Sequence, residues 1–274
     1  MELIKYDLDS FGTGHVFERL TMYAKKQTTY QSIEICELEY LGKVLVLDNI
    51  IQLSSLDCNR YHETFAHIPM SCLHNPKRVL ILGGGDGILA KELLKYDDVI
   101  VDLVDIDRQV CELSDIHLRD LNEGSLTDTR VNVYNIDALE FCGDTPRVYD
   151  VIYADITDPH PNSPSRSLLS KQAMGLYKSL LTEQGIFVAQ VDNVQIAPKH
   201  RINVAKSLRY HFENVGEFAI AALTLSGLFG FLWASNTTKV VPNDITVPTN
   251  WLNKERFMFC FNLLRLALGD TNEK

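Results

Sequence analysis

Apolar and polar residues alternate in the first part of the chain, whereas from Asn75 onward the apolar residues are grouped in short runs. From Tyr23 to about Leu56, apolar and β-branched residues alternate with polar ones, and turn signals stand at Leu41-Gly42 and Asp48-Asn49. This pattern predicts a small antiparallel β-sheet near the N-terminus.

From Asn75 onward, short apolar runs are separated by longer segments with helical spacing of apolar residues. The runs predict strands at 79–82, 101–104, 131–134, 151–154 and 186–191, and the segments predict helices at 86–95, 107–116, 167–181 and 197–212. Such alternation is typical of a Rossmann-like, doubly wound α/β fold. We therefore expect an N-terminal β-rich domain at 1–75 and a Rossmann-like catalytic domain at 76–274, divided at Asn75-Pro76 because proline disfavours a continuing helix.

One uncharged stretch, residues 218–234, is about long enough to cross a bilayer. Thr224, Ser226, Gly227 and Gly230 interrupt it, so the pattern favours a pair of buried strands joined by a turn. The first ten residues are mixed in charge and lack the apolar centre of a signal peptide. We expect a cytoplasmic protein with no membrane segment.

Charge and cysteine content exclude several classes of function. The 274 residues include 26 basic and 36 acidic ones, for a net charge of −10, and no block of lysine and arginine occurs. Sequence-independent binding of nucleic acid is therefore excluded, whereas a cationic ligand suits the chain. The six cysteines are never closer than the 14 residues between Cys58 and Cys72, so no CxxC motif for zinc or thioredoxin chemistry is present, and no metal is expected.

A glycine-rich turn, Gly83-Gly84-Gly85-Asp86-Gly87, follows the first strand of the predicted α/β domain. In a doubly wound fold this turn approaches the ligand closely. A dinucleotide-binding turn would have a small residue in place of Ile88 and no acid facing the pyrophosphate. The turn therefore favours a ligand of the S-adenosylmethionine type, whose sulfonium and amine Asp86 can accommodate.

Acidic residues recur at the ends of the next strands. Asp105 ends the second strand, where it can accept hydrogen bonds from ribose hydroxyls, and Asp137-Ala138 ends the third, where a carboxylate can accept one from the adenine amine. Taken singly, Asp105 could be a loop acid and Asp137 a helix N-cap, as we expect for Asp107. Their recurrence at successive strand ends favours a nucleoside site.

The fourth strand ends in Asp155-Ile156-Thr157-Asp158-Pro159. Amino-methyltransferases of this architecture usually carry an Asn-Pro-Pro-aromatic sequence here, which is absent. Two carboxylates indicate instead a positively charged nucleophile that must lose a proton. A simple turn at Asp158-Pro159 is the alternative interpretation.

Several motifs together resemble the polyamine aminopropyltransferases, the spermidine synthases. These are Gln31, LDNIIQLSSLDCNRYHETFAHIPM at 47–70, VLILGGGDG at 79–87, DID at 105–107, DA at 137–138, DITDP at 155–159 and IFVAQ at 186–190. The resemblance implies transfer of an aminopropyl group from decarboxylated S-adenosylmethionine to an amine, with release of methylthioadenosine. It also implies a homodimer or homotetramer.

The resemblance assigns roles to individual residues. Donor ligands would be Gln31, His62, Gly83, Gly85, Asp86, Asp105, Asp137 and Ala138. Asp155 would be the catalytic base, and Tyr61, Asp158 and Gln190 would lie on the acceptor side, with Tyr61 and Asp158 contributing to catalysis.

The acceptor side departs from the family pattern. An acid usual in the family is replaced by Cys58, a cation is added at Arg60, and the segment 222–230 has no tyrosine. We therefore expect an altered acceptor pocket and poor use of putrescine.

Three alternatives remain open from the sequence. S-Adenosylmethionine itself could be the donor of a 3-amino-3-carboxypropyl group in specialised metabolism, such as tailoring of a microcin C-type peptide-nucleotide antibiotic, with Arg60 pairing the extra carboxylate. The chain could also be a non-catalytic adenosyl-ligand-binding subunit or an ordinary methyltransferase. Acids in the pocket favour the decarboxylated donor, because a second negative charge there is repelled.

Overall fold

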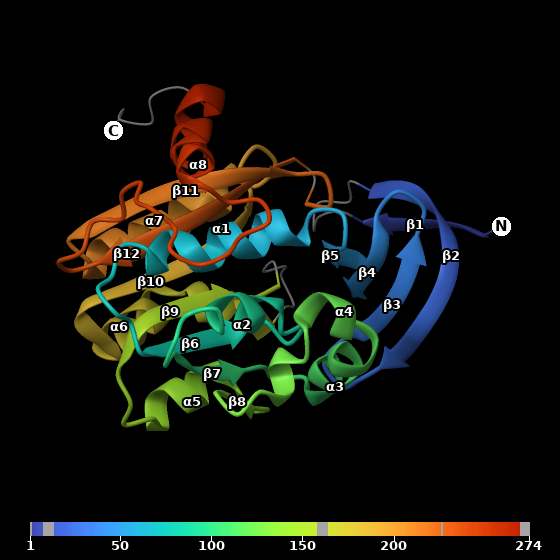
Figure 1. Cartoon of the computed structure of the whole chain (residues 1–274), viewed down its shortest axis with the longest axis horizontal. Helices are drawn as coiled ribbons and strands as arrows, with labels where there is room; N and C mark the ends of the chain where they lie inside the picture. Colours follow the sequence, from blue (N-terminus) through green and yellow to red (C-terminus); the bar gives the residue numbers. More distant parts are fainter. Residues whose placement is uncertain (1, 8–13, 158–163, 226, 269–274) are drawn as a thin grey trace.

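The computed structural model describes residues 2–7, 14–157, 164–225 and 227–268. Its first part is a closed five-stranded β-barrel (Figure 1). The strands are β1 (Glu2–Asp7), β2 (Gly14–Gln27), β3 (Ser32–Leu38), β4 (Gly42–Leu47) and β5 (Ile50–Ser54). Consecutive strands pair antiparallel, and a parallel bridge between Asp7 and Ile50 closes the barrel. The observed sheet thus begins at Glu2, earlier in the chain than the start near Tyr23 that the sequence pattern predicted.

Both faces of strand β3 in the barrel are buried. Cys36, Leu38 and Val44 pack inside it, whereas Ile33 and Ile35 on the opposite face of β3 pack toward the rest of the molecule. Because side chains alternate along a strand, β3 fills the barrel with one set of residues and joins the second part of the fold with the other.

The second part is built on a seven-stranded sheet, which confirms the predicted doubly wound α/β fold. Its strands are β6 (Arg78–Gly83), β7 (Ile100–Val104), β8 (Val131–Tyr134), β9 (Tyr149–Asp155), β10 (Leu181–Asn193), β11 (Asn214–Ala222) and β12 (Gly227–Ser235). Their order is β11-β12-β10-β9-β6-β7-β8. The five strands β10, β9, β6, β7 and β8 are parallel, and β12 pairs antiparallel with both β10 and β11. The direction of winding reverses between β6 and β9, which is where ligands bind in such sheets.

Helices cover both faces of this sheet (Figure 1). They are α1 (Cys58–Met70), α2 (Ile88–Leu93), α3 (Arg108–His117), α4 (Arg119–Asn122), α5 (Ala138–Asp144), α6 (Lys171–Ser179), α7 (Pro198–His211) and α8 (Lys254–Leu268), with short 3₁₀ turns at Ser125–Thr127 and Pro164–Leu169. Residues of α1, α2 and α8 pack on one face, and residues of α5, α6 and α7 pack on the other. The sheet therefore has a hydrophobic core on each side.

Helix α1 precedes the Rossmann-like strands in the chain but lies against α2 and β11. Its Glu63 is fully buried, and the two carboxylate oxygens accept three backbone N–H groups, from Asn250, Trp251 and Leu252, at 2.6 to 2.7 Å. A single buried carboxylate thus fixes the segment that leads into α8.

Two predicted helices are shorter than expected. The segment 167–181 contains a break at Ser170, whose hydroxyl accepts the Ala173 N–H at 3.2 Å and starts α6, and Leu181 already pairs with Tyr149 in the sheet. Helix α2 begins only at Ile88 because Gly87 adopts a left-handed conformation, with φ of +79°.

The apolar stretch 218–234 forms parts of β11 and β12, as predicted. Among the described residues, none of the helices is both long and apolar enough to span a bilayer.

Candidate active site

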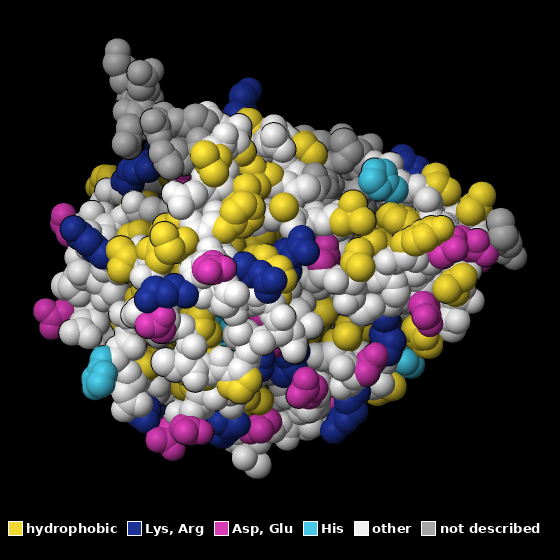
Figure 2. Space-filling model, turned by 45° about the horizontal axis from the view of Figure 1, so that its top comes forward, with side chains coloured by type: hydrophobic (Ala, Val, Ile, Leu, Met, Phe, Trp, Pro, Cys, Tyr) yellow, Lys and Arg dark blue, Asp and Glu magenta, His cyan; other side chains and the backbone are white. Residues whose placement is uncertain are grey.

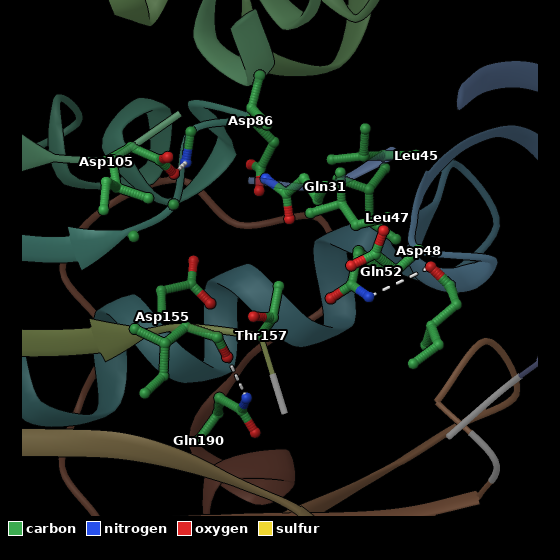
Figure 3. Close-up of a pocket in the computed structure, with 18 of the residues that line it drawn as sticks. Gln31, Leu45, Leu47, Asp48, Gln52, Asp86, Asp105, Asp155, Thr157 and Gln190 are labelled. Atoms are coloured by element: carbon green, nitrogen blue, oxygen red, sulfur yellow. Dashed lines mark hydrogen bonds between the residues drawn. The ribbon is translucent and has the colours of Figure 1, made fainter. Parts of the chain in front are cut away.

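A cavity of about 280 Å³ lies at the carboxyl ends of β6 and β9, between the sheet and the barrel (Figure 3). Gly83 and Asp155 are register partners at the ends of these two strands. The barrel supplies Gln31, Leu45, Leu47, Asp48, Ile50, Ile51, Gln52 and Leu53 to its wall. The cavity therefore forms at the strand-order reversal, where the fold predicts a ligand.

The glycine turn leaves room for Asp105 and Asp155 to lie close to its backbone at the cavity. Gly83 and Gly84 have φ of +85° and +70°, and a Cβ at Gly83 would lie 2.1 Å from the Asp155 carbonyl oxygen. A Cβ at Gly85 would lie 2.6 Å from a carboxylate oxygen of Asp105. Larger residues here would separate Asp105 and Asp155 from the turn.

Asp105 receives two backbone hydrogen bonds, from the Gly85 N–H at 3.0 Å and the Asp107 N–H at 2.9 Å. Burial raises the pKa of Asp105 to about 6, against the effect of these two bonds. The carboxylate lines the cavity in a fixed orientation and can accept further hydrogen bonds from a ligand.

His62 and Asp86 lie together on another wall of the cavity. The His62 Nδ1 lies 2.8 Å from the Cys58 carbonyl oxygen, so this nitrogen carries the proton and Nε2 is left as an acceptor, 3.8 Å from an Asp86 oxygen. Burial lowers the pKa of His62 despite the nearby Asp86. A neutral imidazole beside a carboxylate favours a ligand that carries N–H donors or positive charge.

Asp155 is the most perturbed acid of the site. The Tyr61 hydroxyl donates to one of its oxygens at 2.8 Å, and the other oxygen is buried with no hydrogen-bond partner within the described residues. Burial, assisted by the charges of Asp86 and Asp105 and opposed by the Tyr61 hydrogen bond, raises the pKa of Asp155 to about 8. Single ligand atoms of Asp155, Asp86 and His62 lie within 4.8 Å of one another. A cation placed among them would stabilise the ionised form of Asp155.

Asp137 and Ala138 line the cavity at the point where α5 begins. One Asp137 oxygen accepts the backbone N–H groups of Leu139 and Glu140 at 2.7 and 3.1 Å, so this residue is a helix N-cap. The capping role, which the sequence left as an alternative, is therefore present together with a position on the cavity wall.

Gln190 faces the cavity from β10, and its amide binds backbone groups. Its nitrogen donates to the Ile156 carbonyl oxygen (Figure 3). Its oxygen accepts the Asp192 N–H at 2.9 Å. Gln190 thus holds the segment that follows Asp155.

The cavity contains every described residue to which the family resemblance assigned a role. These are Gln31, Tyr61, His62, Gly83, Gly85, Asp86, Asp105, Asp137, Ala138, Asp155 and Gln190. Asp158 lies outside the described residues. Gln52, Thr157, Leu225 and Phe229 also line the cavity, although no individual role was assigned to them from the sequence. Each lies in a segment already singled out: Gln52 in 47–70, Thr157 in 155–159, and Leu225 and Phe229 in 222–230. Gln52 also stands out as a polar residue within the apolar run of β5.

The β11–β12 turn forms an apolar part of the wall. Leu225 and Phe229 lie there, and Phe229 contacts the Tyr61 ring edge-to-face with centroids 5.8 Å apart. The buried Asp57 carboxylate anchors this turn, because it accepts the Thr224 N–H at 3.1 Å and the Thr224 hydroxyl at 2.5 Å.

Arg60 does not line the cavity. Its guanidinium donates to the Ala221 carbonyl oxygen at 2.5 Å and lies over the Trp251 ring, 5.4 Å from the centroid. The described residues that line the cavity include neither lysine nor arginine. The alternative with S-adenosylmethionine as donor needs Arg60 to pair with the donor carboxylate, and this geometry does not place Arg60 at the cavity.

Comparisons with known proteins agree with this geometry. The family model of the spermine/spermidine synthase domain matches residues 58–244, and that of the spermidine synthase tetramerisation domain matches residues 21–55. Polyamine aminopropyltransferase 1 of Hyperthermus butylicus is 33% identical over 246 residues, covering 86% of this chain and 84% of its own. The polyamine aminopropyltransferase of Sulfolobus acidocaldarius is 31% identical over 264 residues, covering 95% of this chain and 84% of its own.

Solved structures show the same fold. A spermidine synthase in complex with the transition state analogue AdoDATO superimposes with a TM-score of 0.89 at 25% identity, covering 98% of this chain and 95% of the other. The spermidine synthase from Thermotoga maritima gives 0.88 at 25% identity, covering 98% and 94%. The chain therefore belongs to the spermine/spermidine synthase family and is a transferase of the polyamine aminopropyltransferase type.

Proposed function

We propose that this enzyme transfers the aminopropyl group of decarboxylated S-adenosylmethionine to an amine whose carbon chain is longer or more apolar than that of putrescine. The observation that carries the proposal is the composition of the cavity wall, where Asp86, Asp105 and Asp155 converge and an apolar surface lies beside them. The relative in the AdoDATO complex supports the same donor class.

Electrostatics favours the decarboxylated donor. A donor carboxylate about 4 Å from one of the acids would be repelled by about 4 kcal/mol at an effective dielectric constant near 20, which corresponds to several hundredfold in affinity. The residues available to offset this repulsion are acids, amides and apolar groups, because Arg60 is held at Ala221. The amine and sulfonium of the decarboxylated donor suit the same residues.

In the proposed reaction, the amine lone pair attacks the methylene carbon next to the sulfonium. The carbon–sulfur bond breaks, and its electron pair stays on sulfur as the thioether of methylthioadenosine. Asp155 accepts the proton that the attacking amine loses. A bound sulfonium lowers the pKa of Asp155 from its raised value, so the donor itself ionises the base before the amine reacts.

The apolar wall near Tyr61 supports the proposed acceptor. Leu225 and Phe229 offer apolar side chains in the segment where the family pattern has a tyrosine to bind a short diamine. Methylene groups gain about 0.8 kcal/mol each when they are buried against such a surface. A longer aminoalkyl chain is therefore favoured over putrescine.

The test is product analysis by mass spectrometry, with both donors and a panel of amines of increasing chain length. We expect methylthioadenosine and an acceptor heavier by one aminopropyl group, with putrescine among the poorer acceptors. Formation of S-adenosylhomocysteine would indicate methyl transfer and contradict the proposal. Efficient use of micromolar putrescine would overturn the acceptor assignment alone.

We also propose that the barrel mediates assembly into a dimer or tetramer. The match to a tetramerisation domain supports this, as do Leu3, Val16 and Leu20, which are 64%, 61% and 55% exposed on the outer face of β1 and β2. Figure 2 shows apolar side chains gathered on this part of the surface. Light scattering on the intact protein and on a Leu20→Glu variant tests the proposal, and a monomeric wild type contradicts it.

A further inference from the structure

The turn between β2 and β3 contacts the start of α3, and this contact joins the barrel to the sheet at the cavity. Asp107, 2% exposed, uses its two carboxylate oxygens for different partners. One accepts the Gln109 N–H at 3.1 Å and caps α3. The other accepts the Thr28 hydroxyl at 2.8 Å and the Gln31 side-chain N–H at 3.2 Å. A single buried group therefore caps the helix and also holds the barrel turn.

This contact determines how the Gln31 amide is oriented. A carboxylate that caps a helix accepts hydrogen bonds, so the amide nitrogen of Gln31 must face Asp107. The amide oxygen is then left for the cavity, which Gln31 lines. Figure 3 shows this oxygen directed toward the open space near Thr157. The cavity gains a hydrogen-bond acceptor at this position in place of a donor.

We propose that Asp107 is a positioning residue for donor binding, which acts by fixing the Gln31 amide with its oxygen toward the ligand. The inference rests on the proposed function, because the donor nucleoside presents ribose hydroxyls and an amine, both of which need acceptors. Asp107 acts through Gln31 in this arrangement, since Gln31 lines the cavity and Asp107 does not.

An Asp107→Asn variant separates the two roles of this side chain. Asparagine caps a helix as well as aspartate does, so α3 is retained. Its amide nitrogen, however, is a donor and cannot receive the Gln31 N–H. The Gln31 amide then turns over, and an N–H group faces the donor. We expect affinity for methylthioadenosine and for the decarboxylated donor to fall by about tenfold or more. The ligand loses the hydrogen bond to the Gln31 oxygen, and one of its own donor groups then faces the Gln31 N–H. The kcat at saturating donor should change little.

Rescue provides the readout that a merely structural role would not give. Adding Gln31→Glu to Asp107→Asn restores an acceptor on both sides, because one glutamate oxygen receives the asparagine N–H and the other faces the cavity. We expect most of the lost affinity to return in the double variant. Gln31→Glu alone places two carboxylates against each other and should weaken binding. A double-mutant cycle then shows strong coupling between positions 31 and 107.

Calorimetric titration with methylthioadenosine measures all four proteins without requiring turnover. A Gln31→Leu variant, which leaves Asp107 and the helix cap intact, should lose affinity to a similar extent and keeps the test valid if Asp107→Asn folds poorly. Unchanged affinity in Gln31→Leu, or additive effects of the two substitutions in the cycle, would overturn the positioning role. Failure of the wild type to bind methylthioadenosine would instead contradict the proposed function.

Discussion

Replacement of Tyr61 by phenylalanine should shift the pH dependence of catalysis to higher pH. The Tyr61 hydroxyl donates to Asp155 at 2.8 Å and is the group that lowers the pKa of this buried acid. A hydrogen bond to a charged group contributes about 1.5 to 3 kcal/mol, which corresponds to about 1 to 2 pH units. The wild-type pKa of about 8 should therefore rise further in the variant.

The sign follows from the proposed role of Asp155 as a base. Only the ionised carboxylate accepts a proton, so kcat/KM rises with pH through the pKa of the free enzyme. The ascending limb should move upward by about one unit or more in Tyr61→Phe, and kcat/KM at pH 7 should fall about tenfold or more. At pH values above both ascending limbs, the kcat/KM values of the two proteins should become equal.

The assay follows methylthioadenosine release by chromatography from pH 6 to 10, at low donor concentration and with one fixed amine. Phenylalanine keeps the ring contacts with Phe65, Phe229 and Phe231, so the substitution removes little besides the hydroxyl. Ionisation of the amine affects both proteins equally and cancels in the comparison. An unchanged ascending limb, or a loss of activity of equal size at every pH, would refute this account of Asp155.

Four further outcomes are expected. Asp155→Asn should lower kcat by about a hundredfold or more while methylthioadenosine binding by calorimetry stays nearly intact, since general bases contribute effects of that size; unchanged turnover would exclude the role. Asp105→Asn should weaken the donor and methylthioadenosine alike, and a loss confined to one of them would contradict a ribose site. Thr224→Val removes the hydroxyl bound to Asp57 and should raise the KM of the amine without changing donor affinity in steady-state kinetics. Glu92→Gln should lower the free energy of unfolding in urea by about 3 to 5 kcal/mol, as expected when one partner of a buried ion pair is removed.

The Glu92 contribution should also depend on pH. Burial alone would raise the pKa of Glu92, but hydrogen bonds from His67 and Lys95 outweigh it and lower the pKa to about 2 from an ordinary 4.5. The stabilisation is therefore complete above about pH 4.5 and is lost as the pH falls toward 2. Urea unfolding at pH 7 and pH 3 should show a smaller difference between wild type and Glu92→Gln at the lower pH.

Sequence patterns predicted the parallel sheet and the acids at its strand ends well. Short apolar runs mark buried parallel strands, and the residue after each run lies at the ligand-binding edge because the strands all point the same way. Asp105 and Asp155 were found in this manner. The apolar run at 218–234 was also assigned correctly, because Gly227 and the polar residues near it indicate a turn.

Elements whose burial depends on distant partners were not predictable from local pattern. Strand β2 is exposed or half-buried along its length, so it lacks a strong alternation. Helix α8 carries exposed Met258, Phe259 and Leu266 beside buried Phe257 and Cys260, which obscures the helical period. The direction of Arg60 depends on how α1 packs against β11 and Trp251, which spacing along the chain does not reveal.

Helix α1 constrains how this enzyme can change. Within a few residues it provides Tyr61 to Asp155, His62 to the cavity wall, Glu63 to the C-terminal segment and Phe65 to the sheet core. A substitution on one side of such a helix disturbs a neighbour with a different task, so tolerance to mutation should be low from Tyr61 onward. In the described part of the β11–β12 turn, Asp57 anchors Thr224 and the neighbouring Leu225 lines the cavity. Substitutions in that turn can therefore change the preferred acceptor during evolution, whereas substitutions in α1 would disturb several other contacts.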